Sequence, residues 1–313
     1  MTLPDNAIEA RGLLKIYPAT KTTPEMQALK GIDLVVPRGS IFGLLGPNGA
    51  GKSTFINILS GMTRKTAGTV SIWGRDIDQR SRDARAAIGV VPQEIAADVF
   101  FTPRESLDVQ AGLYGVPKAE RRTGELLAAM GLADKADAYV RQLSGGMKRR
   151  LMVAKAMVHN PPVLILDEPT AGVDVELRRQ LWAYVVELNR LGVTIVLTTH
   201  YLEEAEQLCD TIAIVNHGLV VACEPTSQLL RRLDSRTVVV TPEAPLAAPP
   251  DLAPFEARLR PGGDLAVTFK TAQAGVEQVI AAVRAAGVPI KDLRTEEPDL
   301  EDVFVSLTYG AAA

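Results

Sequence analysis

The sequence lacks a long apolar run, because no stretch approaches the roughly 18–20 residues that a membrane-spanning helix needs. It also has little net charge: 34 Lys and Arg against 37 Asp and Glu leave a formal charge of −3. A face basic enough to wrap nucleic acid is not indicated, so we expect no nucleic-acid partner. The first residues carry Asp5, Glu9 and Arg11 and lack the apolar core of a signal peptide. We therefore expect a cytoplasmic protein.

Cysteine is scarce, with Cys209 and Cys223 as its two representatives. Without a cysteine-rich framework or an export signal, we expect free, buried thiols in a reducing compartment rather than a disulfide. The remaining composition is ordinary, with 47% hydrophobic and 23% charged residues in a chain of 313. That length suggests about two domains.

Alternating apolar segments indicate an α/β fold with a mostly parallel sheet. Residues 163–167 and 193–199 are apolar, β-branched runs typical of buried parallel strands, and residues 176–191 between them have helical spacing. Further short strands are expected at 8–16, 32–36, 40–45, 70–73 and 87–91, with a helix at 53–60. The pattern predicts a layered α/β core in which strands alternate with helices.

A helical region interrupts this core. Within 103–138 we expect helices at 105–114 and 118–130, and a further helix at 144–159. We place this helical subdomain at about 94–160.

The character of the chain changes after about residue 225. Residues 241–254 hold five prolines and suggest an irregular connection. Beyond them we expect a strand at 264–270, a helix at 274–286, a strand at 288–294 and a helix at 300–308. We therefore expect a catalytic domain over 1–225 and a small α+β domain over 226–313.

A glycine-rich loop joins a predicted strand to a predicted helix. Its residues fit the whole pattern Gly-x-x-x-x-Gly-Lys-Ser: Gly46, Pro47, Asn48, Gly49, Ala50, Gly51, Lys52, Ser53 and Thr54. The glycines let backbone N–H groups converge on phosphates, and the helix directs its positive end at the same anion. Lys52 is expected to reach the β- and γ-phosphates of ATP, and Ser53 to bind Mg²⁺. The alternative is a glycine-rich turn with a surface lysine.

Two adjacent carboxylates follow the apolar strand at 163–166. Since ligands bind at the carboxyl ends of parallel strands, Asp167 is placed to hold the water shell of Mg²⁺. Glu168 is placed to orient the attacking water or to accept its proton. The alternative is a strand that merely ends in polar residues.

The segment Leu143-Ser144-Gly145-Gly146-Met147 lies between the glycine-rich loop and the acidic strand. It resembles the signature motif of ATP-binding-cassette (ABC) ATPases, which implies the P-loop fold of that family, with an antiparallel β part near the N-terminus. In that family Ser144, Gly145 and Gly146 would contact ATP held by the glycine-rich loop of a second subunit. The alternative is an ordinary helix start with a serine cap.

Other positions match the same family one by one. Tyr17 resembles the aromatic residue that stacks on adenine, with a core tyrosine as the alternative. Gln93 resembles the glutamine that contacts Mg²⁺ or the attacking water. Asp174 resembles the residue of the loop that pairs across the dimer, and His200 the histidine that contacts the γ-phosphate and orders Glu168.

Two departures from the family pattern occur, Met147 in place of glutamine and Ala-Gly-Val-Asp in place of Ser-Ala-Leu-Asp. Neither removes a group with an assigned chemical role. Both fit the ABC-2 exporter branch, to which the stretches 168–174, 199–206 and 298–304 are also similar, and within it the YadG type.

This resemblance implies an ATPase that uses ATP and Mg²⁺ and energises an ABC-2 type permease made as a separate chain. The ATPase would pair with a second copy of itself or with a paralogue, on the cytoplasmic face of the plasma membrane. Phe100, Phe101, Leu113 and Tyr114 would either dock the permease or form the core of the helical subdomain. A non-transport ABC ATPase is the alternative function.

Overall fold

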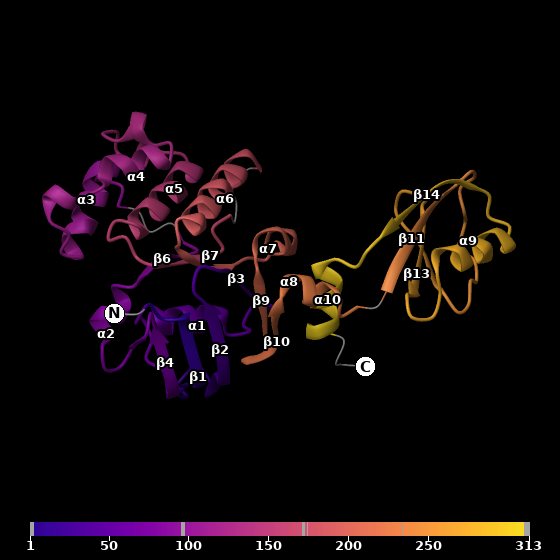
Figure 1. The fold of residues 1–313 in the computed structure, drawn as a ribbon, viewed down its shortest axis with the longest axis horizontal. Helices are drawn as coiled ribbons and strands as arrows, with labels where there is room; N and C mark the ends of the chain where they lie inside the picture. The colour runs from indigo at the N-terminus through magenta and orange to yellow at the C-terminus, as the bar shows by residue number, and fades with distance from the viewer. Residues whose placement is uncertain (1–2, 95–97, 171–172, 174, 234, 310–313) are drawn as a thin grey trace. The chain divides into compact units, whose positions relative to one another are not determined.

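The computed structural model describes residues 3–94, 98–170, 173, 175–233 and 235–309. The chain forms two compact units, Met1–Thr226 and Ser227–Ala313 (Figure 1).

The N-terminal part of the first unit is a four-stranded antiparallel sheet in the order β2-β1-β4-β5. Its strands are β1 (Asn6–Tyr17), β2 (Met26–Pro37), β4 (Ala67–Ile72) and β5 (Arg75–Asp76). β1 and β2 are longer than the sequence predicts because they pair along their full length, from Asn6 with Pro37 to Tyr17 with Met26. The expected antiparallel part is thus confirmed.

A six-stranded sheet in the order β10-β9-β3-β8-β7-β6 forms the centre of the first unit. Its strands are β3 (Ile41–Leu45), β6 (Ile88–Val91), β7 (Val163–Asp167), β8 (Thr194–Thr198), β9 (Thr211–Asn216) and β10 (Leu219–Pro225). All neighbours pair in parallel except β10, which runs antiparallel to β9. The predicted mostly parallel sheet is confirmed, and the carboxyl ends of β3, β7 and β8 meet at one edge.

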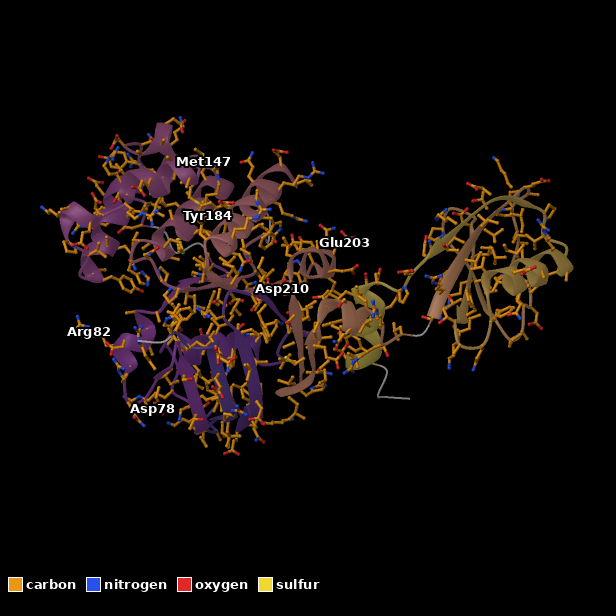
Figure 2. All side chains as sticks on the ribbon, in the orientation of Figure 1. Asp78, Arg82, Met147, Tyr184, Glu203 and Asp210 are labelled. Atoms are coloured by element: carbon orange, nitrogen blue, oxygen red, sulfur yellow. The ribbon has the colours of Figure 1, made fainter. Side chains whose placement is uncertain are left out.

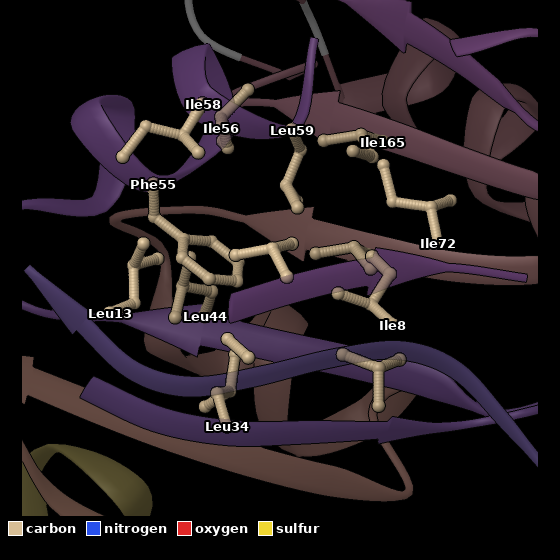
Figure 3. Close-up of a cluster of buried hydrophobic side chains, with 14 of the residues drawn as sticks. Ile8, Leu13, Leu34, Leu44, Phe55, Ile56, Ile58, Leu59, Ile72 and Ile165 are labelled. Atoms are coloured by element: carbon tan, nitrogen blue, oxygen red, sulfur yellow. The ribbon is translucent and has the colours of Figure 1, made fainter. Parts of the chain in front are cut away.

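The core of the first unit joins both sheets through helix α1 (Lys52–Leu59). Figure 3 shows Phe55 and Leu59 of this helix among Ile8 and Leu13 of β1 and Leu44 of β3. Complete burial of an aromatic side chain such as Phe55 stabilises the fold by about 1.5–3 kcal/mol. The packing fixes α1 directly behind the glycine-rich loop. Three further helices of this unit are α2 (Ser81–Arg85), α6 (Val175–Arg190) and α7 (Leu202–Leu208).

The helical subdomain contains α3 (Pro103–Leu113), η1 (Lys118–Glu120), α4 (Thr123–Ala129), η2 (Ala133–Lys135), η3 (Val140–Gln142) and α5 (Gly145–Ala156). Figure 1 shows α3, α4 and α5 grouped together. The expectation of one helix over 118–130 is wrong, because Arg121 takes an extended backbone conformation between η1 and α4. Thr102 and Glu105 form a capping box that fixes the start of α3.

The second unit contains a four-stranded antiparallel sheet in the order β12-β13-β11-β14. Its elements are α8 (Thr226–Leu230, which starts at the last residue of the first unit), β11 (Ser235–Pro242), β12 (Glu256–Leu259), β13 (Leu265–Lys270), α9 (Val276–Ala285), β14 (Ile290–Glu296) and α10 (Leu300–Thr308). Val279 and Val283 of α9 pack into the core of this sheet. The expected strands and helices beyond residue 264 are present, whereas β11 and β12 were not predicted.

Both cysteines are free thiols, but the expectation that both are buried is wrong for Cys223, which is exposed on β10. Burial raises the pKa of the Cys209 thiol to about 12. No helix in the described ranges is long and apolar enough to cross a membrane.

Candidate active site

The glycine-rich loop follows β3 and leads into α1. Gly46 has a φ of 155°, and a Cβ atom there would lie 2.1 Å from the carbonyl oxygen of Val215. Gly51 has a φ of 114°, and its Cβ would lie 2.8 Å from the carbonyl oxygen of Ala28. Both positions require glycine because of close backbone approach and because L-residues rarely adopt such φ values.

The start of α1 offers unpaired backbone N–H groups. Its N-cap, Gly51, supplies no side-chain hydrogen bond, and its first turn contains no acidic residue. The positive end of the helix is therefore uncompensated, which suits a bound anion. Ser53 is exposed and Thr54 is half-buried on this first turn.

Lys52 lies in the same loop with its side chain folded back. Its Nζ donates to the carbonyl oxygens of Gly46 at 2.7 Å and Pro47 at 3.1 Å. Burial lowers the pKa of the Lys52 ammonium, while the negative charges of Glu168 and Asp167 act in the opposite direction.

Asp167 ends strand β7, Glu168 follows it, and Thr198 of β8 holds both residues. The Thr198 hydroxyl donates to Asp167 Oδ1 at 2.5 Å and accepts from the Glu168 N–H at 3.0 Å. Glu168 has a φ of 47°, a left-handed conformation that is uncommon for a non-glycine residue. Such strain is typical of functional sites.

Two residues distant in sequence converge on Glu168. Gln93 Nε2 donates to Glu168 Oε2 at 2.8 Å, and His200 Nδ1 lies 3.5 Å from the same oxygen. The Glu168 side chain is 16% exposed and the His200 side chain 53% exposed. A carboxylate at the end of a parallel strand, with an amide and an imidazole directed at it, can order and deprotonate a water molecule.

Comparison with known proteins places this arrangement in a family. The family model described as ABC transporter matches residues 29–171. The linearmycin resistance ATP-binding protein of Bacillus subtilis is 36% identical to this chain, in an alignment that covers 90% of this chain and 93% of the relative. The chain belongs to the ABC transporter family.

Two further relatives extend the comparison. The Nod factor export ATP-binding protein I of Ralstonia nicotianae is 36% identical over 97% of this chain and 96% of its own length. The daunorubicin/doxorubicin resistance ATP-binding protein of Streptomyces peucetius is 41% identical over 76% of this chain and 71% of its own length.

Solved ABC structures share the fold. An ATP-binding subunit of an ABC transporter, 31% identical, has a TM-score of 0.65 over 74% of this chain and 93% of its own. An ATP-binding cassette in a dimeric post-hydrolysis state with ADP and Pi is 27% identical, with a TM-score of 0.63 over 70% of this chain and 98% of its own. The chain is thus an ABC ATPase with the P-loop fold of that family.

The ABC signature segment starts helix α5. Ser144 is its N-cap, and the Ser144 hydroxyl accepts from the Met147 N–H at 3.2 Å (Met147 is labelled in Figure 2). Ser144 and Gly145 are exposed, and no hydrogen bond within the described part of the chain joins the signature to the glycine-rich loop. Ser144 thus caps α5 as in an ordinary serine-capped helix start, and this cap uses the Met147 N–H. Within the described residues, the N–H groups of Gly145 and Gly146 remain available.

Two other expected site residues are placed differently. Tyr17 ends β1 and is half-buried, with Lys15 Nζ 4.5 Å from its ring centroid. Asp174 lies outside the described residues. Gln93, Glu168 and His200 are thus brought together directly, whereas Tyr17 lies at the carboxyl end of β1, an inner strand of the antiparallel sheet.

Sequence reasoning missed the buried Arg149 of α5. It is 4% exposed, and its Nη1 donates to the carbonyl oxygen of Pro92, next to Gln93, at 2.9 Å. Burial lowers the pKa of Arg149, and the charges of Asp167 and Glu168 partly oppose that effect. The sequence offered no signal, because Lys148 and Arg150 on either side carry the same charge.

The helical subdomain carries an exposed apolar surface beside two adjoining cavities. Phe100 and Leu113 are 75% and 78% exposed, so they do not form the core of the subdomain, which is built from residues such as Leu107 and Leu127. Cavities of about 160 and 350 Å³ share Gln110, Met152 and Lys155 in their walls. This groove runs between α3 and α5.

Proposed function

We propose that this chain hydrolyses ATP to drive export through a separate membrane permease. The observation that carries the proposal is the convergence of Gln93 and His200 on Glu168, at the sheet edge that also holds the glycine-rich loop. In this reading Glu168 takes the proton of a water whose oxygen attacks the γ-phosphorus. The bond from that phosphorus to the β–γ bridging oxygen breaks, and ADP leaves.

The phosphates of ATP would lie over the start of α1. They would replace the carbonyl oxygens of Gly46 and Pro47 as the partners of the Lys52 ammonium. Tyr17 would offer a ring face to adenine. The catalytic assignment falls entirely within residues 1–225, and we propose that residues 226–313 form an accessory domain.

The residues present suit Mg²⁺. Asp167, Ser53 and Gln93 offer carboxylate, hydroxyl and amide oxygens, the hard donors that Mg²⁺ prefers, with Asp167 acting through water. No cluster of three or more His, Cys, Asp or Glu occurs among the described residues, and a site completed by phosphates and water does not need one. When bound, Mg²⁺ would neutralise charge on the phosphates.

We further propose that two ATPase subunits pair, as a homodimer or with a paralogue. Ser144, Gly145 and Gly146 would then present the exposed start of α5 to ATP bound by the other subunit, with Asp174 at the interface. A dimeric solved cassette with ADP and Pi supports this arrangement. Closure on ATP and reopening after hydrolysis would alternate the two states of the transporter.

The groove between α3 and α5 is our candidate for the permease contact. Leu113 and Phe101 supply an apolar surface in the smaller cavity, whose wall also holds Asp98. Arg85 and Lys155 supply two cations to the larger cavity, and no acidic residue is among the described residues of its wall. We propose that a short helix of an ABC-2 type permease, with an apolar face and a carboxylate, docks there on the cytoplasmic face of the membrane. The relatives named for linearmycin resistance, Nod factor export and daunorubicin/doxorubicin resistance support an export role.

Steady-state phosphate release tests the assignment of Glu168. Glu168→Gln should slow release by about 100-fold or more while ATP still binds, because the amide cannot accept the proton. The control Glu120→Gln changes an exposed glutamate of η1 and should release phosphate at the wild-type rate. Normal phosphate release by Glu168→Gln would contradict the proposal.

Detergent-solubilised membranes test the permease assignment. The wild-type chain should co-purify with a multi-span membrane protein whose addition stimulates its ATPase activity, and the double variant Phe100→Ser/Leu113→Ser should lose both effects. If the wild-type chain and the double variant both have full ATPase activity and neither co-purifies with a membrane protein, the result would instead favour a non-transport ABC ATPase.

A further inference from the structure

Glu204 is a buried carboxylate that the proposed hydrolysis does not use. It lies on α7 and is 7% exposed. A buried charge is unfavourable unless charged and hydrogen-bonding partners compensate it. The groups that contact the Glu204 carboxylate therefore indicate its structural role.

Those contacts join three separate segments. Glu204 Oε2 accepts from Thr170 Oγ1 at 2.9 Å and from Thr199 Oγ1 at 3.1 Å. Glu204 Oε1 lies 3.3 Å from Arg178 Nε of α6, as an ion pair without hydrogen-bond geometry. One carboxylate thus ties together the segment that follows β7, the residue that follows β8 and the first turn of α6.

The same contacts enclose His200 on both sides in the sequence. Thr199, which precedes it, donates to Glu204 and accepts from the N–H of Tyr201 at 3.0 Å. Tyr201, which follows it, lies under the Arg178 guanidinium at 4.4 Å, and its ring centroid lies 4.1 Å from that of His200. Both neighbours of His200 are therefore fixed by the pair of Glu204 and Arg178.

We propose that the buried Glu204 and the partly buried Arg178 form an ionic clamp that positions His200 against Glu168. The clamp holds the β8 end through Thr199 and the β7 end through Thr170, and so sets the 3.5 Å approach between His200 Nδ1 and Glu168 Oε2. Glu204 and Arg178 are positioning residues in this account, because they act through His200. The inference rests on the proposed ATPase function.

Conservative substitutions separate positioning from folding. Glu204→Gln keeps a carbonyl oxygen for the two threonines but removes the charge that Arg178 needs. The double variant Arg178→Met/Glu204→Gln removes both charges together, so that neither is left unpaired, and the glutamine keeps a carbonyl oxygen as the acceptor for the two buried threonine hydroxyls. Glu203→Gln is the matched control, since Glu203 is the exposed neighbour on α7 (labelled in Figure 2).

The kinetic constants kcat and KM, the affinity for a fluorescent ATP analogue and the Tm are then measured on the whole chain. We expect Glu204→Gln and the double variant to lose about 10-fold or more in kcat, with KM changed less than about twofold, because small misplacements of catalytic groups slow turnover. The double variant should keep the wild-type Tm, and Glu203→Gln should match the wild type throughout. A double variant with wild-type Tm and wild-type kcat would overturn the proposal.

A double-mutant cycle tests whether the clamp acts through His200. In a His200→Ala background, Glu204→Gln should cause no further loss of kcat, since the positioned group is already gone. Additive losses would refute the positioning role. Failure of the ATPase proposal is distinguishable, because then the wild-type chain itself would not release phosphate, or Glu168→Gln would release it normally.

Discussion

Replacing Lys52 with methionine should abolish most of the stabilisation by ATP while leaving the nucleotide-free protein almost unchanged in stability. Without nucleotide, the Lys52 ammonium donates to two backbone carbonyls, those of Gly46 and Pro47, which are half-buried and can bond to water instead. Burial opposes the charged form of Lys52, as its lowered pKa indicates, so its removal also relieves a desolvation cost. Methionine keeps the apolar stem. We expect the free energy of unfolding to change by about 1 kcal/mol or less.

The effect of ATP is larger. At a concentration 100 times the Kd, ATP stabilises the wild-type fold by about 2.7 kcal/mol. A hydrogen bond between the ammonium and a phosphate contributes about 1.5–3 kcal/mol, so its loss should raise the Kd by about 10- to 150-fold. If the Kd rises 100-fold, the same ATP concentration stabilises the variant by only about 0.4 kcal/mol.

Urea denaturation with and without Mg-ATP measures both quantities. The Glu168→Gln background prevents consumption of ATP during the experiment. Lys118→Met, at an exposed lysine of η1, is the control and should respond to ATP as the parent does. A Lys52→Met variant that ATP still stabilises by about 2 kcal/mol or more would refute the reasoning.

Three further perturbations test the local geometry. Gly46→Ala should destabilise the fold by about 3 kcal/mol in denaturant titrations, because the added Cβ would lie 2.1 Å from a backbone carbonyl oxygen of β9. The control Gly124→Ala, in α4, should not destabilise the fold, because its Cβ would meet no atom within 4 Å. Thr198→Val should lower kcat by about 10-fold, because it removes the hydroxyl that holds the Asp167 carboxylate and the backbone N–H of Glu168. An unchanged kcat would contradict this role. The buried Cys209, with its pKa of about 12, should resist alkylation at pH 8 in the folded protein, whereas the exposed Cys223 should react first. Mass spectrometry of the modified peptides measures which cysteine has reacted.

The glycine-rich loop was predictable from the sequence because its parts are contiguous. Gly46, Gly51 and Lys52 act through one short stretch of backbone, so spacing alone specifies the geometry. The strand ending at Asp167 was predictable for a similar reason, since an apolar run that is buried on both faces reads as a parallel strand.

The partners of Glu168 depend on topology. Gln93 and His200 reach it because β6 and β8 flank β7, an order that no local pattern encodes. Their roles were inferred through family resemblance, and the structure adds the distances. Neither the local sequence pattern nor the family resemblance predicted the role of Glu204, because the sequence Glu203-Glu204 does not reveal which of the two carboxylates is buried.

In the proposed dimer, each ATP would contact the glycine-rich loop of one subunit and the signature of the other. The starts of two helices explain why one chain can supply both kinds of contact. Among the helices of eight or more residues in the described part of the chain, α1 and α5 lack an acidic residue in the first turn, whereas α3, α6, α9 and α10 have at least one. An acidic residue there would neutralise the positive helix end, so its absence leaves that end available for an anion. α1 starts at the glycine-rich loop and α5 starts at the exposed signature. The two uncompensated helix starts are thus the two that the proposed composite site would direct at one ATP from opposite subunits.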